Sequence, residues 1–319
     1  MKLLDVRGLE VTYRTFWGPV KAVRGVSFSV SEAERLGIVG ESGSGKSTVG
    51  LAILRLLPAN AIVKGSIIYR GRNIYAMSKR ELRSIRGREL SIIFQDPLAS
   101  LNPTLTVGEQ LVNIASSLKP GLRRSEYIEL ALEALKRARV PDPERVLKSY
   151  PHQLSGGMQQ RVVIASAIMG RPKLLIADEP TTQLDVTIQA QILMLLKKLS
   201  EELRMSLILI THNLGVVAAV CHSVAVMYAG KLVEYGLVRD VLTNPLHPYT
   251  TSLLSCIPRV RGERREPKPI PGEPPNMIRP PPGCPFHPRC PHAVERCRRE
   301  EPPLVEVDGR LVACHQYGG

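Results

Sequence analysis

One short motif constrains the fold of this chain more than any other feature. Residues 40–47 read GESGSGKS and match the pattern G-x-x-x-x-G-K-[ST] throughout. The motif follows an apolar stretch that predicts a strand, residues 35–39, and it opens a predicted helix, residues 46–57. A glycine-rich turn in this position lets backbone N–H groups curl around phosphate oxygens, and the start of the helix adds a favourable dipole. The sequence therefore predicts a phosphate-binding loop in an α/β fold.

The loop supplies a compact set of candidate nucleotide contacts. Lys46 is expected to reach the β- and γ-phosphates, and the Ser47 hydroxyl is expected to ligate Mg²⁺. The residues expected to contact ATP here are Gly40, Ser42, Gly43, Ser44, Gly45, Lys46, Ser47 and Thr48.

Two carboxylates follow a second apolar stretch. Residues 174–179 read LLIADE, so Asp178 is expected at the carboxyl end of a buried strand, beside the phosphate loop. There it can hold Mg²⁺ through water. Glu179 comes next, and a second carboxylate in that place can polarise an attacking water.

Short apolar segments alternate with helical patterns along the chain, which predicts a mostly parallel α/β sheet. The composition changes near residue 258, because more than half of the 26 prolines lie between 258 and 303. Neither helices nor central strands absorb that density. We therefore divide the chain into a nucleotide-binding domain (1–257), a proline-rich connector (258–283) and a cysteine-rich tail (284–319).

Four of the six cysteines lie in that tail: Cys284, Cys290, Cys297 and Cys314. Without an export signal, such a cluster favours a metal site over disulfides. The spacing contains none of the C-x₂₋₄-C pairs usual in Cys₄ zinc sites, which favours an iron–sulfur cluster. A mixed Cys/His zinc site, reduced thiols and disulfides stay open as alternatives.

The net charge and the lengths of the apolar runs limit the possible partners and cellular location of the chain. The formal net charge of +14 permits nucleic acid, anionic lipid or phosphate-bearing ligands, and equally a merely soluble basic protein. Apolar runs such as residues 162–169 fall short of the ~18 residues that span a bilayer. Asp5, Arg7 and Glu10 lie where a signal peptide would need its apolar core. We expect a cytoplasmic protein that does not cross a membrane, although it can sit on one.

Residues 154–161, LSGGMQQR, closely resemble the signature of ATP-binding cassette (ABC) ATPases. Most of residues 1–257 share the order of motifs in that family, from the phosphate loop through the signature to the carboxylate pair and a histidine. The resemblance implies an α/β fold with a RecA-like core, an antiparallel β subdomain and a helical signature subdomain at about 98–170, followed here by the small cysteine-rich extension.

The resemblance also assigns roles around ATP. Tyr13 is expected to stack on adenine, with neighbouring Phe16 and Trp17 as alternatives. The signature residues expected to contact the ATP of an opposing subunit are Ser155, Gly156, Gly157 and Gln159. A serine–glycine–glycine turn that opens a helix is itself a suitable anion site, so a head-to-tail pair of subunits with ATP between them is expected.

Further roles come from the same resemblance. Gln95 is expected to sense Mg²⁺ and the attacking water, and Asp185 to line the dimer interface. His212 is expected to contact the γ-phosphate and to orient Glu179 and water. The catalytic set implied is thus Glu179, His212 and Gln95, with Ser47, Gln95 and Asp178 around Mg²⁺. Gln183 and Asn213 differ from the residues usual in the family.

Segments such as residues 92–111, 244–254 and 283–297 resemble the ATPase subunits of oligopeptide and dipeptide importers. Some members of that group carry a [4Fe–4S] cluster in the C-terminal extension. The resemblance therefore implies ATP, Mg²⁺ and such a cluster as cofactors, with zinc as the alternative for the cluster.

The partners implied are two integral membrane permease subunits, a second ATPase subunit that is expected to be a paralogue, and an extracellular or periplasmic solute-binding protein. The chain would be peripheral on the cytoplasmic face of the cell membrane. Sugars, oligosaccharides or nickel are alternative solutes within the same family. A soluble ABC ATPase acting on nucleic acid or ribosomes is a distant alternative, and no nucleic acid is expected as a partner.

Overall fold

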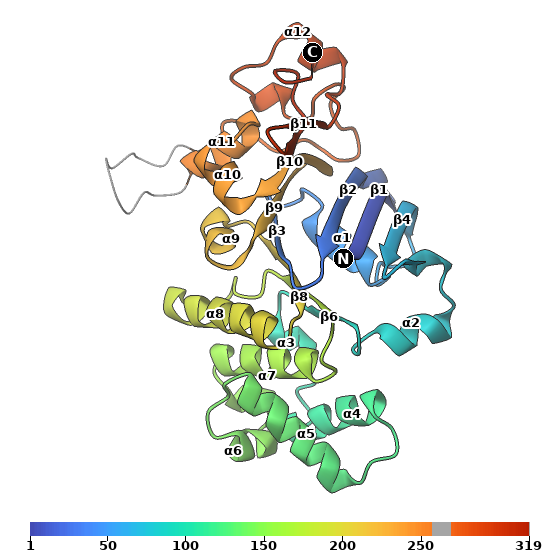
Figure 1. Ribbon diagram of the computed structural model, residues 1–319, viewed down its shortest axis with the longest axis vertical. Helices are drawn as coiled ribbons and strands as arrows, with labels where there is room; N and C mark the ends of the chain where they lie inside the picture. Colours follow the sequence, from blue (N-terminus) through green and yellow to red (C-terminus); the bar gives the residue numbers. More distant parts are fainter. Residues whose placement is uncertain (257–268, 319) are drawn as a thin grey trace. The chain divides into compact units, whose positions relative to one another are not determined.

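The structure is a computed structural model that describes residues 1–256 and 269–318 (Figure 1). It contains two compact units, which we call unit 1 (Met1–Ala76 with Leu209–Gly319) and unit 2 (Met77–Ile208). Residues 258–268 of the predicted connector lie outside the described residues. Among the residues that the structure describes, no helix has the length and apolar character needed to cross a membrane.

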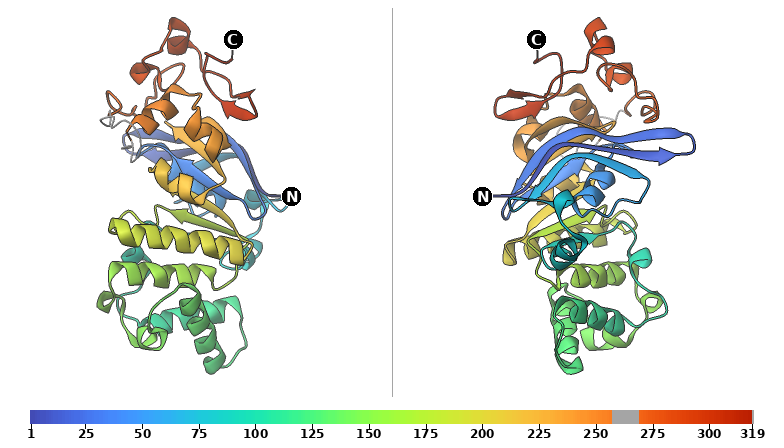
Figure 2. Two further views of the ribbon diagram at one scale, coloured as in Figure 1. Left: turned by 60° about the vertical axis from the view of Figure 1, so that its left-hand side comes forward. Right: turned by 90° about the vertical axis from the view of Figure 1, so that its right-hand side faces the viewer.

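Unit 1 begins with an antiparallel sheet in the order β2-β1-β4-β5. Its strands are β1 (Lys2–Thr15), β2 (Gly18–Ser31), β4 (Ala61–Tyr69) and β5 (Arg72–Asn73). The long hairpin of β1 and β2 is drawn in dark blue in the right-hand view of Figure 2.

The first two strands, β1 and β2, are long and contain 14 residues each. Val6 and Leu9 are both almost fully buried, although residues three apart on a regular strand face opposite sides. A register shift between them lets one continuous strand bury both.

A second sheet in unit 1 has the neighbours β11-β12-β10-β9-β3. Its strands are β3 (Arg35–Val39), β9 (Ser223–Tyr228), β10 (Lys231–Leu237), β11 (Val305–Val307) and β12 (Arg310–Val312). The strands β3 and β9 are parallel, as expected, whereas β10, β11 and β12 add antiparallel pairs. Because β12 pairs with β10, the C-terminal residues extend this sheet.

Unit 1 also contains short helices. They are α1 (Lys46–Ile53), α9 (Leu214–Val220), α10 (Val238–Thr243), α11 (Pro248–Ser255), α12 (Glu295–Arg299) and the 3₁₀ turns Ile74–Ala76 and His287–Arg289. The helix α1 ends earlier than the expected residue 57, because Arg55 has a left-handed backbone with φ 52°. The start of α11 is well specified, since Pro248 takes the first helical position and the His247 ring accepts a hydrogen bond from the Tyr249 N–H.

Unit 2 is mostly helical around the parallel pair β6 (Leu90–Ile93) and β7 (Leu174–Asp178). Its helices are α2 (Lys79–Ile85), α3 (Pro97–Ser100), α4 (Val107–Leu118), α5 (Arg124–Arg137), α6 (Pro143–Lys148), the 3₁₀ turn Pro151–Gln153, α7 (Gly156–Ile168) and α8 (Val186–Glu202). Figure 1 shows α4, α5 and α6 close together below α7. The strand β8 (Ser206–Thr211) carries the chain from unit 2 into unit 1.

Candidate nucleotide-binding site

The phosphate loop lies between β3 and α1, as the sequence predicts. Its backbone takes conformations that only glycine adopts easily: φ is 154° at Gly40 and 96° at Gly45. A Cβ atom at Gly40 would lie 2.1 Å from the Met227 carbonyl oxygen, and one at Gly45 would lie 2.3 Å from the Ala22 carbonyl oxygen. Any side chain at either position would therefore displace the loop.

Lys46 is the first residue of α1 and only 5% exposed. Its Nζ donates to the carbonyl oxygens of Gly40 and Glu41, each at 2.8 Å, and to Ser44 Oγ at 3.4 Å. The ammonium is thus held inside the turn of the loop. Its charge and the start of α1 act on the same small space, which suits an anionic phosphate.

Of the three aromatic candidates for adenine, Tyr13 is the one beside the phosphate loop. Its hydroxyl lies 3.1 Å from Thr48 Oγ1, in the first turn of α1. Phe16 and Trp17 are 93% and 80% exposed at the tip of the β1–β2 hairpin, where their rings pack edge to face. This contact favours Tyr13.

His212 directly follows β8 in unit 1 and is exposed. The next residue, Asn213, caps α9, because its side-chain oxygen accepts a hydrogen bond from the Gly215 N–H at 2.8 Å. Aspartate and asparagine serve this capping role about equally well. The departure from the family at Asn213 therefore keeps the local structure.

In unit 2, two of the expected magnesium ligands follow neighbouring strands. β6 and β7 are parallel, with Ile93 opposite Ala177, so their carboxyl ends lie at one edge of the sheet. Asp178 ends β7 and is buried, whereas Gln95 lies two residues beyond β6 and is exposed. Glu179 has a left-handed backbone, with φ 44°, and its carboxylate accepts a hydrogen bond from Thr182 Oγ1 at 2.8 Å.

Of the signature residues, Ser155 and Gly156 are exposed, whereas Gln159 is buried. Ser155 and Gly156 are exposed at the start of α7, and a Cβ atom at Gly157 would lie 2.8 Å from the Ile188 side chain. Gln159, which we expected to contact nucleotide, points inward: its Nε2 donates to the carbonyls of Pro151 and Leu154 at 2.9 and 3.1 Å. In this conformation Gln159 supports the turn before the signature.

Asp185 occupies the N-cap of α8, and its carboxylate accepts a hydrogen bond from the Ile188 N–H at 2.9 Å. The same helix therefore supplies Ile188, which fills the space beside Gly157. Asp185 has at least this local structural role within unit 2.

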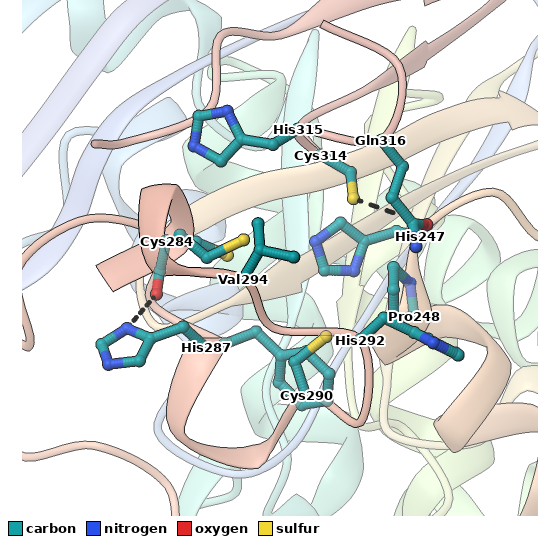
Figure 3. Close-up of a pocket in the computed structure, with 12 residues that line it drawn as sticks. His247, Pro248, Cys284, His287, Cys290, His292, Val294, Cys314, His315 and Gln316 are labelled. Carbon is teal, nitrogen blue, oxygen red and sulfur yellow. Dashed lines mark hydrogen bonds between the residues drawn. The ribbon is translucent and has the colours of Figure 1, made fainter. Parts of the chain in front are cut away.

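The four cysteines of the tail line one cavity of about 200 Å³ in unit 1, together with His247 and other residues. Figure 3 shows the sulfur atoms of Cys284, Cys290 and Cys314 directed toward it. Burial raises the pKa of Cys284 to about 11, so that thiol is neutral near pH 7. Within residues 1–256 and 269–318, no three His, Cys, Asp or Glu side chains form a group able to hold a single metal ion.

Two residues contact the phosphate loop although the sequence did not predict it. Arg289, beside Cys290, forms an ion pair with Glu41 of the loop, and the Tyr249 hydroxyl accepts a hydrogen bond from the Glu41 N–H. Tyr249 belongs to the segment 244–254, whose sequence indicates a family but not this contact. No local pattern relates Glu41 to Arg289, because they are 248 residues apart.

Comparison with known proteins agrees with this geometry. Residues 23–182 match the family described as "ABC transporter", and residues 233–297 match "Oligopeptide/dipeptide transporter, C-terminal region". The oligopeptide transport ATP-binding protein OppD of Salmonella typhimurium is 50% identical over 312 residues, which cover 98% of this chain and 93% of that protein. The chain belongs to the ABC transporter family.

Other relatives place it more narrowly within the ABC transporters. The dipeptide transport ATP-binding protein DppD of Bacillus subtilis is 48% identical over 98% of this chain and 94% of its own length. A solved dimeric ATP-binding cassette in a post-hydrolysis state with ADP and Pi has a TM-score of 0.65 at 29% identity, over 74% of this chain and 99% of that one. The predicted P-loop fold and the ATPase assignment are confirmed, and the chain is the ATP-hydrolysing subunit of an ABC transporter of the oligopeptide/dipeptide group.

Proposed function

We propose that this chain hydrolyses ATP on the cytoplasmic face of the membrane to drive uptake of dipeptides or oligopeptides through two permease subunits. The observation that carries the proposal is similarity along the whole chain, including the C-terminal region, to peptide transport ATP-binding proteins. The phosphate loop and its buried Lys46 supply the matching chemistry.

Different residues of this chain act on different parts of ATP. The loop N–H groups and Lys46 bind the phosphates, and Tyr13 stacks on adenine. Ser47, Asp178 and Gln95 would hold Mg²⁺, since hydroxyl, carboxylate and amide oxygens suit that hard cation. Bound Mg²⁺ neutralises charge on the phosphates. Glu179 accepts a proton from the attacking water, and His212 orients that water.

A second subunit completes each site in this proposal. The exposed start of α7 at Ser155 and Gly156 presents the N–H groups of a helix N-terminus to the phosphate held by the opposing subunit. The similar cassette structure is described as dimeric and bound to ADP and Pi, which supports this arrangement. We propose that the partner is a paralogous ATPase subunit and that an external solute-binding protein delivers the peptide.

The tail has the donor chemistry for a [4Fe–4S] cluster. Four thiols line its cavity, and thiolates are the usual ligands of such clusters. Cys284, Cys290, Cys297 and Cys314 would hold the cluster, and metal binding would add folding energy to the tail.

Affinity capture of the tagged chain from solubilised native membranes tests the transporter assignment. We expect two multi-span proteins, a second ATPase and a solute-binding protein to copurify, and the binding protein then to bind peptides. Capture mainly with ribosomes or DNA from the soluble fraction would contradict the proposal. If the binding protein instead prefers sugars or nickel, the ATPase role would stand but the transported solute would not be a peptide.

A further inference from the structure

The second residue of the phosphate loop, Glu41, is held by the cysteine-rich tail (residues 284–319), which we also call the C-terminal extension. Arg289 forms a two-pronged ion pair with it: Nη1 lies 2.6 Å from Oε2, and Nη2 lies 3.0 Å from Oε1. The Arg289 side chain is only 5% exposed, and that of Glu41 is 25% exposed. A bidentate pair in such a protected place is both stronger and more directional than a surface ion pair.

Arg289 is itself anchored on its other side. Its Nε donates to the Pro271 carbonyl at 2.8 Å, and its Nη1 lies 3.2 Å from the Tyr228 hydroxyl, which places the guanidinium against the Tyr228 ring. Burial opposes the charge, but the hydrogen bonds with Glu41 and Tyr228 outweigh it and raise the pKa of Arg289. The guanidinium therefore stays charged and has little freedom to leave Glu41.

The main chain of Glu41 is held as well. Its N–H donates to the Tyr249 hydroxyl at 2.8 Å, and Tyr249 is fully buried against Tyr228 and Phe286. Phe286 belongs to the same extension as Arg289. The loop residue is thus held at its carboxylate and at its amide by one packed cluster.

The main-chain carbonyl of Glu41 contacts Lys46, the lysine that is expected to bind the phosphates of ATP. The carbonyl oxygens of Gly40 and Glu41 each accept a hydrogen bond from Lys46 Nζ at 2.8 Å. A shift of Glu41 would therefore move the oxygens that place the Lys46 ammonium. Small errors in the position of such a group are costly to phosphate binding and catalysis.

We propose that Arg289 and Tyr249 are positioning residues for ATP: through Glu41 they hold the phosphate loop in its binding shape, so the C-terminal extension sets nucleotide affinity. Neither residue needs to touch ATP. Arg289 is adjacent to Cys290, so one peptide bond and the Arg289–Glu41 ion pair connect the cysteine cavity to the loop. This proposal rests on ATP binding at the phosphate loop.

The test measures the affinity of the purified full-length chain for ATP by titration with a fluorescent ATP analogue and competition with ATP. We expect Arg289→Ala and Glu41→Gln each to raise the Kd about tenfold, with Arg289→Lys in between. The double variant should be no worse than either single one, because both remove the same contact. Tyr249→Phe, which keeps the ring and removes the acceptor, should raise the Kd about threefold.

Arg299→Ala is the matched control, because Arg299 is a 76% exposed arginine of the same extension that pairs with Glu295. It should leave the Kd unchanged. Hydrogen exchange of the loop amides gives a second readout, and we expect faster exchange in Arg289→Ala before ATP is added.

Two results would overturn the proposal: a Kd within twofold of wild type in folded Arg289→Ala, or effects of Arg289→Ala and Glu41→Gln that simply add. If Arg289→Ala does not fold, the nearly isosteric Glu41→Gln and Tyr249→Phe decide by the same criterion. Wild-type protein that binds no ATP, or binding that survives in Lys46→Ala, would instead contradict the phosphate-loop assignment itself.

Discussion

The ring of Phe286 packs against the ring of Tyr249, with centroids 5.3 Å apart and planes at 61°. Phe286 also meets Tyr228 edge to face at 5.2 Å, and it is fully buried. Aromatic pairs in these arrangements add to the free energy of simple burial. The C-terminal extension is therefore attached to the rest of unit 1 by an aromatic core of its own.

Replacement of that anchor should loosen the extension. Phe286→Ala is expected to lower the free energy of unfolding by about 3–5 kcal/mol, because it removes a fully buried ring and leaves a cavity. Chemical denaturation followed by tyrosine fluorescence measures it. Val294→Ala, at a side chain of the same extension that is 57% exposed, is the control and should change stability little. Equal effects of the two substitutions would contradict the anchoring role.

Glu179→Gln should separate ATP binding from hydrolysis. The amide keeps the shape of the side chain but cannot accept the proton of the attacking water, so we expect ATPase turnover to fall about 10²–10⁴-fold. ATP binding should persist, and the ATP-bound subunits should stay closed as a pair in size-exclusion chromatography. Glu295→Gln, at an exposed carboxylate of α12, should keep wild-type turnover. Normal hydrolysis by Glu179→Gln would remove this residue as the base.

The buried thiol Cys221 should make stability fall at alkaline pH. Burial raises its pKa from 9.0 to about 12, against a smaller opposing effect of Arg35. The unfolded thiol ionises first, so the stabilisation is complete below about pH 9 and is lost as pH rises toward 12. Urea unfolding at several pH values should therefore show a steeper decline for wild type than for Cys221→Ala. Parallel profiles would show that the thiol stays accessible to ionisation in the folded protein.

Protein purified without oxygen should be brown and contain about four irons per chain. Cys290→Ser should lose most of the iron, because its sulfur lines the cavity. Cys256→Ser is a suitable control, since Cys256 lies at the C-cap of α11 and is not among the residues lining that cavity. Colourless protein with one bound zinc would support the alternative metal instead.

Local chemistry made several elements predictable. The strand at residues 35–39 and the loop that follows depend on apolar runs and glycine turns, which act over a few residues. The hairpin at Ala229 and Gly230 and the capped helix α8 have the same kind of local signal. Neighbours along the chain determine these features.

Other features depend on contacts that no periodicity encodes. The long strand β1 needs a register shift at residues that only a partner strand can accommodate. Gln159 turns inward because the carbonyls of Pro151 and Leu154 are within its reach, although its motif suggested a ligand contact.

The amino-acid sequence by itself determined the family, the phosphate loop and the cysteine-rich tail, because glycine turns and the spacing of cysteines are properties of short segments. The tertiary structure alone decided what that tail touches. The contact of Arg289 with Glu41 spans 248 residues and belongs to the same tertiary packing that pairs β12 with β10 and buries Phe286. Burial makes the ion pair of Arg289 and Glu41 a directional contact at the phosphate loop.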